Sequence, residues 1–175
     1  MHYEKLSDKD SIINASTDFW IGDPCYVVPD AQWDAFCDNL MKFESRDENK
    51  DLPRCYISRV EHEETGYVFH TWSTAYGDGS YRLMINNETV EMLGVDAGTL
   101  SVIPIGLIEH WKSKGEIGEY ESHGHVVAAE HLQGELTCHE GDMYWGDVFI
   151  PTSGTDEDDD EDDPWGECEE EGFFL

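Results

Sequence analysis

The sequence predicts an α+β fold, with a mainly antiparallel β-sheet and one or two helices, followed by a disordered acidic tail. Three observations support this prediction. Short runs rich in aromatic and β-branched residues follow one another closely, with turn residues between them. One segment repeats its apolar residues with the period of a helix. The last part of the chain is dominated by acidic residues, which repel one another and cannot form a core.

The predicted strands begin with TDFWIGD (17–23), an apolar run that a Gly-Asp-Pro turn ends. Further strands are predicted at 54–61, 66–74, 80–85, 88–95, 99–105, 125–131, 135–139 and 147–151. Gly77-Asp78-Gly79 is a turn signal, so we expect 80–85 to pair back on 66–74 as a hairpin. Asn86-Asn87 predicts another turn before the next strand.

The clearest helical pattern follows Pro29-Asp30, where Asp30 is expected to cap the N terminus. Its apolar residues recur at helical spacing and form one stripe, which comprises Trp33, Phe36, Cys37, Leu40 and Met41. Residues 106–114 predict a second, shorter helix. Many short strands with one well-defined helix favour a mainly antiparallel sheet.

These patterns divide the chain into a polar lead-in (1–16), a single β-rich domain (17–153) and the acidic tail (154–175). The 6 Trp, 8 Tyr and 7 Phe among 175 residues are sufficient for a real core. The five cysteines include no CxxC pair, as expected for free thiols in a reducing cytoplasm. No apolar run is long enough to span a bilayer, and the polar N terminus predicts no secretory signal. We therefore expect a cytoplasmic protein.

Charge is the strongest signal for function. The chain has 40 acidic and 10 basic residues, a formal net charge of −30. Residues 156–171 contain 12 of the acids and no base, so 28 acids and a net charge of −18 remain for the rest. Such a surface repels nucleic acid and anionic membranes, and neither is an expected partner. The expected partner is a basic protein surface, most naturally that of a nucleic-acid-binding protein.

Three turn motifs occur in a characteristic order: GDPCY (22–26), YGDGSY (76–81) and VDAG (95–98), followed by the strand GDVFI (146–150). As a set they resemble an uncharacterised small-protein family of phages and bacteria, over about residues 19–151. The resemblance implies a phage or mobile-element origin, and hence the host cytoplasm, but no particular chemistry.

The tail separately resembles the acidic C-terminal tails of phage and bacterial single-stranded DNA-binding proteins, which end in an aromatic residue. Such tails recruit replication proteins through a basic pocket. The resemblance implies a partner-binding role for Asp158, Asp159, Asp160, Asp162, Asp163, Trp165, Phe173 and Phe174.

The three turn motifs each contain an aspartate next to Gly or Pro, namely Asp23, Asp78 and Asp96. If the strand ends converge, these carboxylates, with Tyr26 and Tyr81 nearby, would form a rim that binds a ligand or a divalent cation. Ordinary turn chemistry is the alternative, because an aspartate in a turn caps backbone N–H groups. Beyond such a cation, no cofactor is expected.

His123 and His125 are spaced i, i+2, so on a strand both would project from one face, as metal ligands do. The run from His123 to GDVFIP loosely resembles the metal-binding part of cupin barrels, although no later histidine follows that strand. The alternative is a turn at His123-Gly124 that leads into a strand. His62, among Glu61, Glu63 and Glu64, is expected to be solvated.

Three functions remain open. The first is an acidic interaction protein that binds a basic surface on a host or viral protein, as a DNA mimic or inhibitor. The second is small-molecule or nucleotide binding, or metal-dependent hydrolysis, at the rim of turn aspartates. The third is a replication accessory that is recruited through the tail. No phosphate loop, dinucleotide fingerprint, GxSxG or HExxH is present, which argues against the commonest enzyme classes and leaves catalytic residues unassigned.

Overall fold

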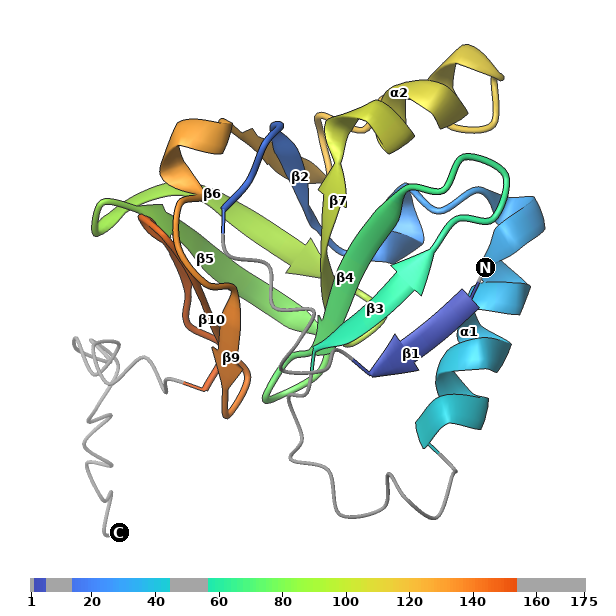
Figure 1. Cartoon of the computed structure of the whole chain (residues 1–175). Helices are drawn as coiled ribbons and strands as arrows, with labels where there is room; N and C mark the ends of the chain where they lie inside the picture. The colour runs from blue at the N-terminus through green and yellow to red at the C-terminus, as the bar shows by residue number, and fades with distance from the viewer. Residues whose placement is uncertain (1, 6–13, 45–56, 154–175) are drawn as a thin grey trace, which may run out of the picture.

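The structure, a computed structural model, describes residues 2–5, 14–44 and 57–153. Within these residues it confirms the α+β class, with two antiparallel sheets and two α-helices (Figure 1). The acidic tail and most of the polar lead-in fall outside the described residues.

The larger sheet has six strands in the order β1–β3–β4–β7–β2–β8, and each neighbouring pair is antiparallel. Its strands are β1 (His2–Lys5), β2 (Phe19–Gly22), β3 (Ser58–Glu61), β4 (Val68–Ser73), β7 (Thr99–Pro104) and β8 (Gly124–Val127). Every residue of β2 and β7 is buried. Both faces of the sheet centre are therefore covered by other layers.

The smaller sheet has five strands in the order β6–β5–β11–β10–β9, again all antiparallel. Its strands are β5 (Gly79–Ile85), β6 (Glu88–Val95), β9 (Thr137–His139), β10 (Asp142–Trp145) and β11 (Val148–Ile150). The sequence pattern did not predict β10, a four-residue strand between two glycine-containing turns.

The predicted hairpin between 66–74 and 80–85 is wrong. β4 pairs with β3 and β7, whereas β5 pairs with β6 and β11, so the Gly77-Asp78-Gly79 turn carries the chain from one sheet to the other. The hairpin forms between β5 and β6 instead, at Asn86 and Asn87. Their φ angles of 53° and 65° suit a two-residue turn whose twist matches that of the strands.

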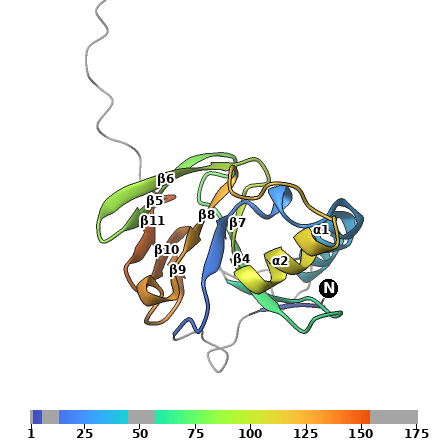
Figure 2. The same ribbon diagram turned by 90° about the horizontal axis from the view of Figure 1, so that it is seen from above.

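The two α-helices lie on the side of the larger sheet that faces away from the smaller one, which makes three layers (Figure 2). The helical elements are α1 (Asp30–Glu44), α2 (Ile105–Ser113) and the short 3₁₀ turns η1 (Pro24–Tyr26) and η3 (Ala129–His131). We predicted Asp30 as the capping residue that precedes the helix. In the structure Asp30 is instead the first residue of α1. Its carboxylate still lies in the first turn, where the helix dipole favours negative charge.

Two apolar cores hold the layers together. The core between the sheets includes Ile21, Trp72, Leu83 and Trp145, and the rings of Trp145 and Phe19 meet edge to face with centroids 5.0 Å apart. The core under the helices includes Trp20, Phe36, Phe69, Ile103, Leu107 and Trp111. Four residues of the predicted α1 stripe supply this second core, because Phe36 is buried and Trp33, Cys37 and Leu40 pack against it. The fifth, Met41, is 62% exposed, so its predicted place in the stripe is wrong.

Two glycines make room for Trp20. A Cβ atom at Gly22 would lie 2.5 Å from the Trp20 ring, and one at Gly124 would lie 2.4 Å from it. Gly22 and Gly124 are register partners in β2 and β8. The indole therefore lies flat over the strand pair, and its Nε1–H donates to the Tyr120 carbonyl at 3.1 Å.

Candidate functional site

Asp23 is fully buried, with 0% of its surface exposed, at the end of β2. Its Oδ1 accepts the Cys25 N–H at 2.8 Å, and its Oδ2 accepts the N–H groups of Asp96 and Ala97 at 2.7 and 2.8 Å. Three charge-assisted hydrogen bonds thus satisfy this carboxylate. They tie the turn after β2 to the turn between β6 and β7.

The Gly77-Asp78-Gly79 turn lies against the turn that contains Asp96 and Gly98. A Cβ atom at Gly98 would approach the Gly77 Cα at 3.5 Å and the Asp78 Oδ1 at 3.8 Å. The turns that contain Asp23, Asp78 and Asp96 are therefore together in the fold, although they are far apart in the sequence. Asp78 and Asp96 are exposed, and Asp23 lies beneath the surface.

Tyr26 joins this rim through its hydroxyl group, which donates to the Asp96 carboxylate. The Tyr26 ring stacks on His123, with centroids 4.2 Å apart and planes 10° from parallel. The hydrogen bond to Asp96, with a smaller contribution from burial, raises the pKa of Tyr26 to about 12. Tyr26 is therefore a protonated hydrogen-bond donor at neutral pH.

Cys25 is not an activated nucleophile. Burial raises the pKa of its thiol well above the usual value, and the hydrogen bond and negative charge of Asp23 raise it further. The charges of Asp96 and Asp78 act in the same direction. A reactive thiol needs the opposite environment, one that favours the thiolate.

The two candidate metal-ligating histidines have different partners. His123 stacks on Tyr26, whereas the Nδ1 atom of His125 lies 3.8 Å from a carboxylate oxygen of Glu91. Among the residues that the structure describes, no group of three or more His, Cys, Asp or Glu side chains is placed to hold a metal ion.

Tyr81 belongs to the core between the sheets, with 8% of its surface exposed. Its hydroxyl group donates to the Gly77 carbonyl at 2.8 Å. From its place in the core, Tyr81 therefore stabilises the turn that contains Asp78. The exposed tyrosine of this turn is Tyr76.

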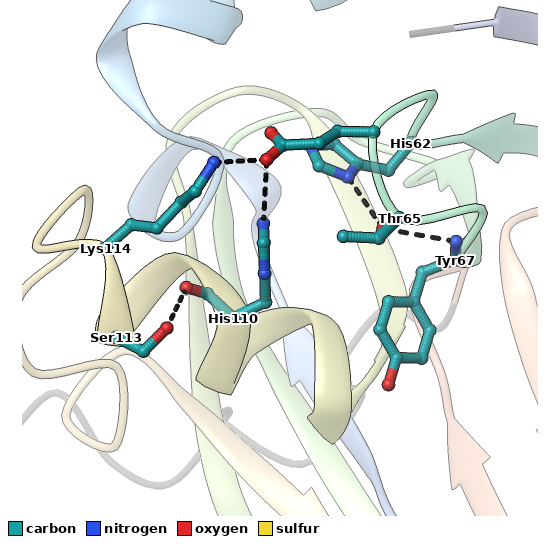
Figure 3. Close-up of polar contacts among 7 residues, drawn as sticks. His62, Thr65, Tyr67, His110, Ser113 and Lys114 are labelled. Atoms are coloured by element: carbon teal, nitrogen blue, oxygen red, sulfur yellow. Dashed lines mark hydrogen bonds and ion pairs between the residues drawn. The ribbon is translucent and has the colours of Figure 1, made fainter.

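His62 is buried, with 4% of its surface exposed. The prediction that it is solvated is therefore wrong. Its Nδ1 lies 2.8 Å from the Thr65 hydroxyl, and its ring packs against His110 of α2 with centroids 5.8 Å apart (Figure 3). The neighbouring Trp111 ring of the same helix lies 5.7 Å from the His62 ring, centroid to centroid. Burial lowers the pKa of His62, and the neighbouring His110 lowers it further.

Glu64 completes this contact between the β3–β4 loop and α2. Its carboxylate accepts a hydrogen bond from Lys114 and lies 4.0 Å from the His110 Nε2 (Figure 3). The hydrogen bond from Lys114 lowers the pKa of Glu64. This cluster attaches the loop to the helix.

The outer side of α1 carries a row of carboxylates that the sequence analysis did not identify. Asp30, Asp34 and Asp38 follow at i, i+4 and i+8, and all three are exposed. The sequence contained the signal, because this spacing places side chains on one face. The apolar stripe of the same helix obscured it. We call these three residues the α1 acidic face.

Four basic residues have described side chains, and each is engaged with neighbouring groups. Arg59 pairs with Glu61 at 3.2 Å, Lys112 with Glu121 at 3.6 Å, and Lys114 with Glu64. Arg82 also makes an interaction. Within the described part of the chain, each of these four cations thus has an interaction partner.

No family model, curated protein or solved structure matches the chain. The resemblance to the phage and bacterial family therefore remains a prediction. The residues predicted to bind a partner in the tail, from Asp158 to Phe174, lie outside the described residues. In the described segments, no helix is both long enough and apolar enough to cross a membrane.

Proposed function

We propose that the protein binds a basic surface of another protein, such as the groove of a nucleic-acid-binding protein, through the α1 acidic face. The observation that carries this proposal is the exposed row of Asp30, Asp34 and Asp38. Residues four apart on a helix are separated by about 6 Å along the axis, so the three carboxylates form a regular line. A line of negative charge is the feature that a surface built for phosphates recognises.

The row is unfavourable for the helix itself. Like charges at i, i+4 destabilise a helix by about 0.2–0.5 kcal/mol per pair, and Asp30, Asp34 and Asp38 make two such pairs. The dipole compensates Asp30 in the first turn, but its effect does not extend to Asp38. Lys42, the one base in the sequence of α1, follows Asp38 at i, i+4, a spacing that offsets part of this cost. Helix stability does not require the row of three acids, and recognition of a cationic surface gives it a role.

The rim of turn aspartates has less support as the binding site. The Asp23 carboxylate is already satisfied by three backbone N–H groups, and Asp96 accepts the Tyr26 hydroxyl. A ligand or cation would have to replace these bonds.

DNA mimicry is the form of the proposal in which the partner's basic site normally binds the phosphates of a nucleic acid. Duplex DNA would then compete with the protein for that site.

The test compares two triple variants with equal changes of charge. One replaces Asp30, Asp34 and Asp38 with Asn. The matched control replaces three exposed acids near the smaller sheet with Gln, and comprises Glu88, Glu130 and Glu135. Proteins captured from a bacterial lysate at low salt are identified, and their affinities for both variants are measured.

Surface charge pairs contribute about 0.2–1 kcal/mol each. The three substitutions together should therefore make the α1 variant bind its partner roughly 3- to 150-fold more weakly, and the control should bind about as the wild type does. Binding should also weaken as salt increases. Equal losses in both variants would contradict a specific role for α1. A full-length variant with Ala at Trp165, Phe173 and Phe174 tests the tail, and loss of binding there would favour recruitment through the tail.

A further inference from the structure

An open cavity of about 450 Å³ lies at one end of the smaller sheet. The residues that line it include Asn86, Asn87, Tyr144, Gly146, Asp147 and Phe149. The smaller sheet and the two α-helices are on opposite sides of the molecule (Figure 2), so the cavity is separate from the α1 acidic face. Its volume falls within the range of small-ligand sites in proteins.

Two turns that are bonded to each other form one wall of the cavity. The β5–β6 turn contains Asn86 and Asn87, and the β10–β11 turn contains Gly146 and Asp147. The Asn86 N–H donates to the Asp147 carbonyl at 3.0 Å, and the Asp147 N–H donates to the His131 carbonyl at 2.9 Å. These hydrogen bonds therefore hold the backbone of this wall in place before any ligand arrives.

An aromatic pair forms the other wall. Tyr144 and Phe149 are register partners in β10 and β11, and their rings stack with centroids 4.6 Å apart and planes 18° from parallel. Tyr144 is 45% exposed, although it lies in the middle of a strand. An exposed tyrosine that a second ring supports offers a fixed, flat surface for a ligand.

The lining carries negative charge and no basic residue. The Asp147 carboxylate is exposed, and its Oδ2 lies 3.1 Å from the His131 Nδ1. No hydrogen bond to its Oδ1 occurs within the described residues. The side-chain oxygens of Asn86 and Asn87 supply further acceptors. In a chain with a net charge of −30, these features favour a cationic ligand with several donors over an anion.

We infer that this cavity binds the guanidinium group of an arginine side chain presented by a peptide segment of a partner. The guanidinium is planar and cationic, so it packs against the aromatic pair of Phe149 and Tyr144, in which Phe149 lies on the side of the β5–β6 turn. Its five N–H donors match the free oxygen of Asp147 and the amide oxygens of the Asn86–Asn87 turn. The inference does not depend on the α1 acidic face, because no residue is shared.

The test is a titration of the full-length protein with N-acetyl-arginine methylamide, followed by NMR. The amide signals of Asn86, Asn87 and Gly146 should shift and saturate at millimolar probe. Replacement of Tyr144 with Ala or Leu, or of Asp147 with Asn, should weaken binding at least about fivefold. The matched control is Tyr76→Ala, which removes a tyrosine that is 65% exposed on another turn and should bind as the wild type does.

Three results would overturn the inference. The first is the absence of saturable shifts at these amides. The second is unchanged binding in both Tyr144→Leu and Asp147→Asn, in spectra that otherwise retain the wild-type pattern. The third is equal or tighter binding of a neutral probe, methyl glucoside, which would assign the aromatic surface to a saccharide instead.

Discussion

Replacement of Asp23 distinguishes a structural turn aspartate from a functional carboxylate. In Asp23→Asn, one oxygen can still accept the N–H groups of Asp96 and Ala97, but the new NH₂ group then faces the Cys25 N–H. One hydrogen bond is lost, and two donors are left facing each other in a buried site. A buried donor without a partner costs about 1–3 kcal/mol, so we expect Asn to destabilise the fold by this amount.

Asp23→Ala leaves all three N–H groups without the carboxylate, and we expect a loss of roughly 3–5 kcal/mol. This is a large part of the 5–15 kcal/mol that stabilises a typical domain. Urea unfolding followed by tryptophan fluorescence measures the change, since Trp20 and Trp72 are buried in the two cores. The control Asp78→Asn alters an exposed carboxylate of the same rim and should stay within about 0.5 kcal/mol of the wild type.

The sign of the stability change in Asp23→Asn distinguishes a structural role of Asp23 from a binding role. If the turn aspartates were assembled to bind a cation or a cationic ligand, their mutual repulsion would cost stability in the empty protein. Removal of the Asp23 charge would then leave stability unchanged or increase it. An Asp23→Asn variant as stable as the wild type would refute the structural role that we assign to this residue.

Three further predictions concern the cores. Burial lowers the pKa of His70 to about 4 from 6.5, so the unfolded chain binds a proton between these pH values that the folded chain does not. The free energy of unfolding of the wild type should therefore fall by about 2 kcal/mol between pH 6.5 and 5 because of this group. Urea denaturation across this range should show a smaller fall for His70→Phe. An equal fall in both proteins would refute the lowered pKa of His70. Gly124→Ala forces a Cβ atom to 2.4 Å from the Trp20 ring and should cost about 1–3 kcal/mol, whereas Gly118→Ala, in open space, should be neutral in the same urea assay. Tyr81→Phe removes the hydrogen bond to the Gly77 carbonyl and should lower the free energy of unfolding by about 0.5–1.5 kcal/mol, with no measurable loss counting against that bond.

The sequence predicted those features that a single segment determines. The stripe from Trp33 to Leu40 packs into a core, and the run at 88–95, which follows the Asn86-Asn87 turn, forms β6. A periodic pattern exposes one face of one element, so it can be recognised without knowledge of any partner. The row of Asp30, Asp34 and Asp38 belongs to the same class, and periodicity applied to the charges would have found it.

Strand pairing depends on the whole chain, so the local sequence pattern did not predict it reliably. The turn at Gly77-Asp78-Gly79 has the residues of a hairpin but joins two sheets, because β7 occupies the edge of β4 that β5 would have needed. His62 was expected in solvent because three glutamates surround it in the sequence. It is buried because α2 packs over it, with Trp111 following 49 residues later in the chain.

The amino-acid sequence by itself determined the fold class, the positions of most strands, the amphipathic helix and the excess of negative charge. Each of these follows from composition or from a repeat within a few residues. Only the tertiary structure brought the three turn aspartates together, assigned Asp23 to backbone N–H groups, and placed the Tyr144 ring beside the Asn86–Asn87 turn. These arrangements depend on long-range strand pairing, where many alternatives share the same local pattern and the packing of the whole chain selects one.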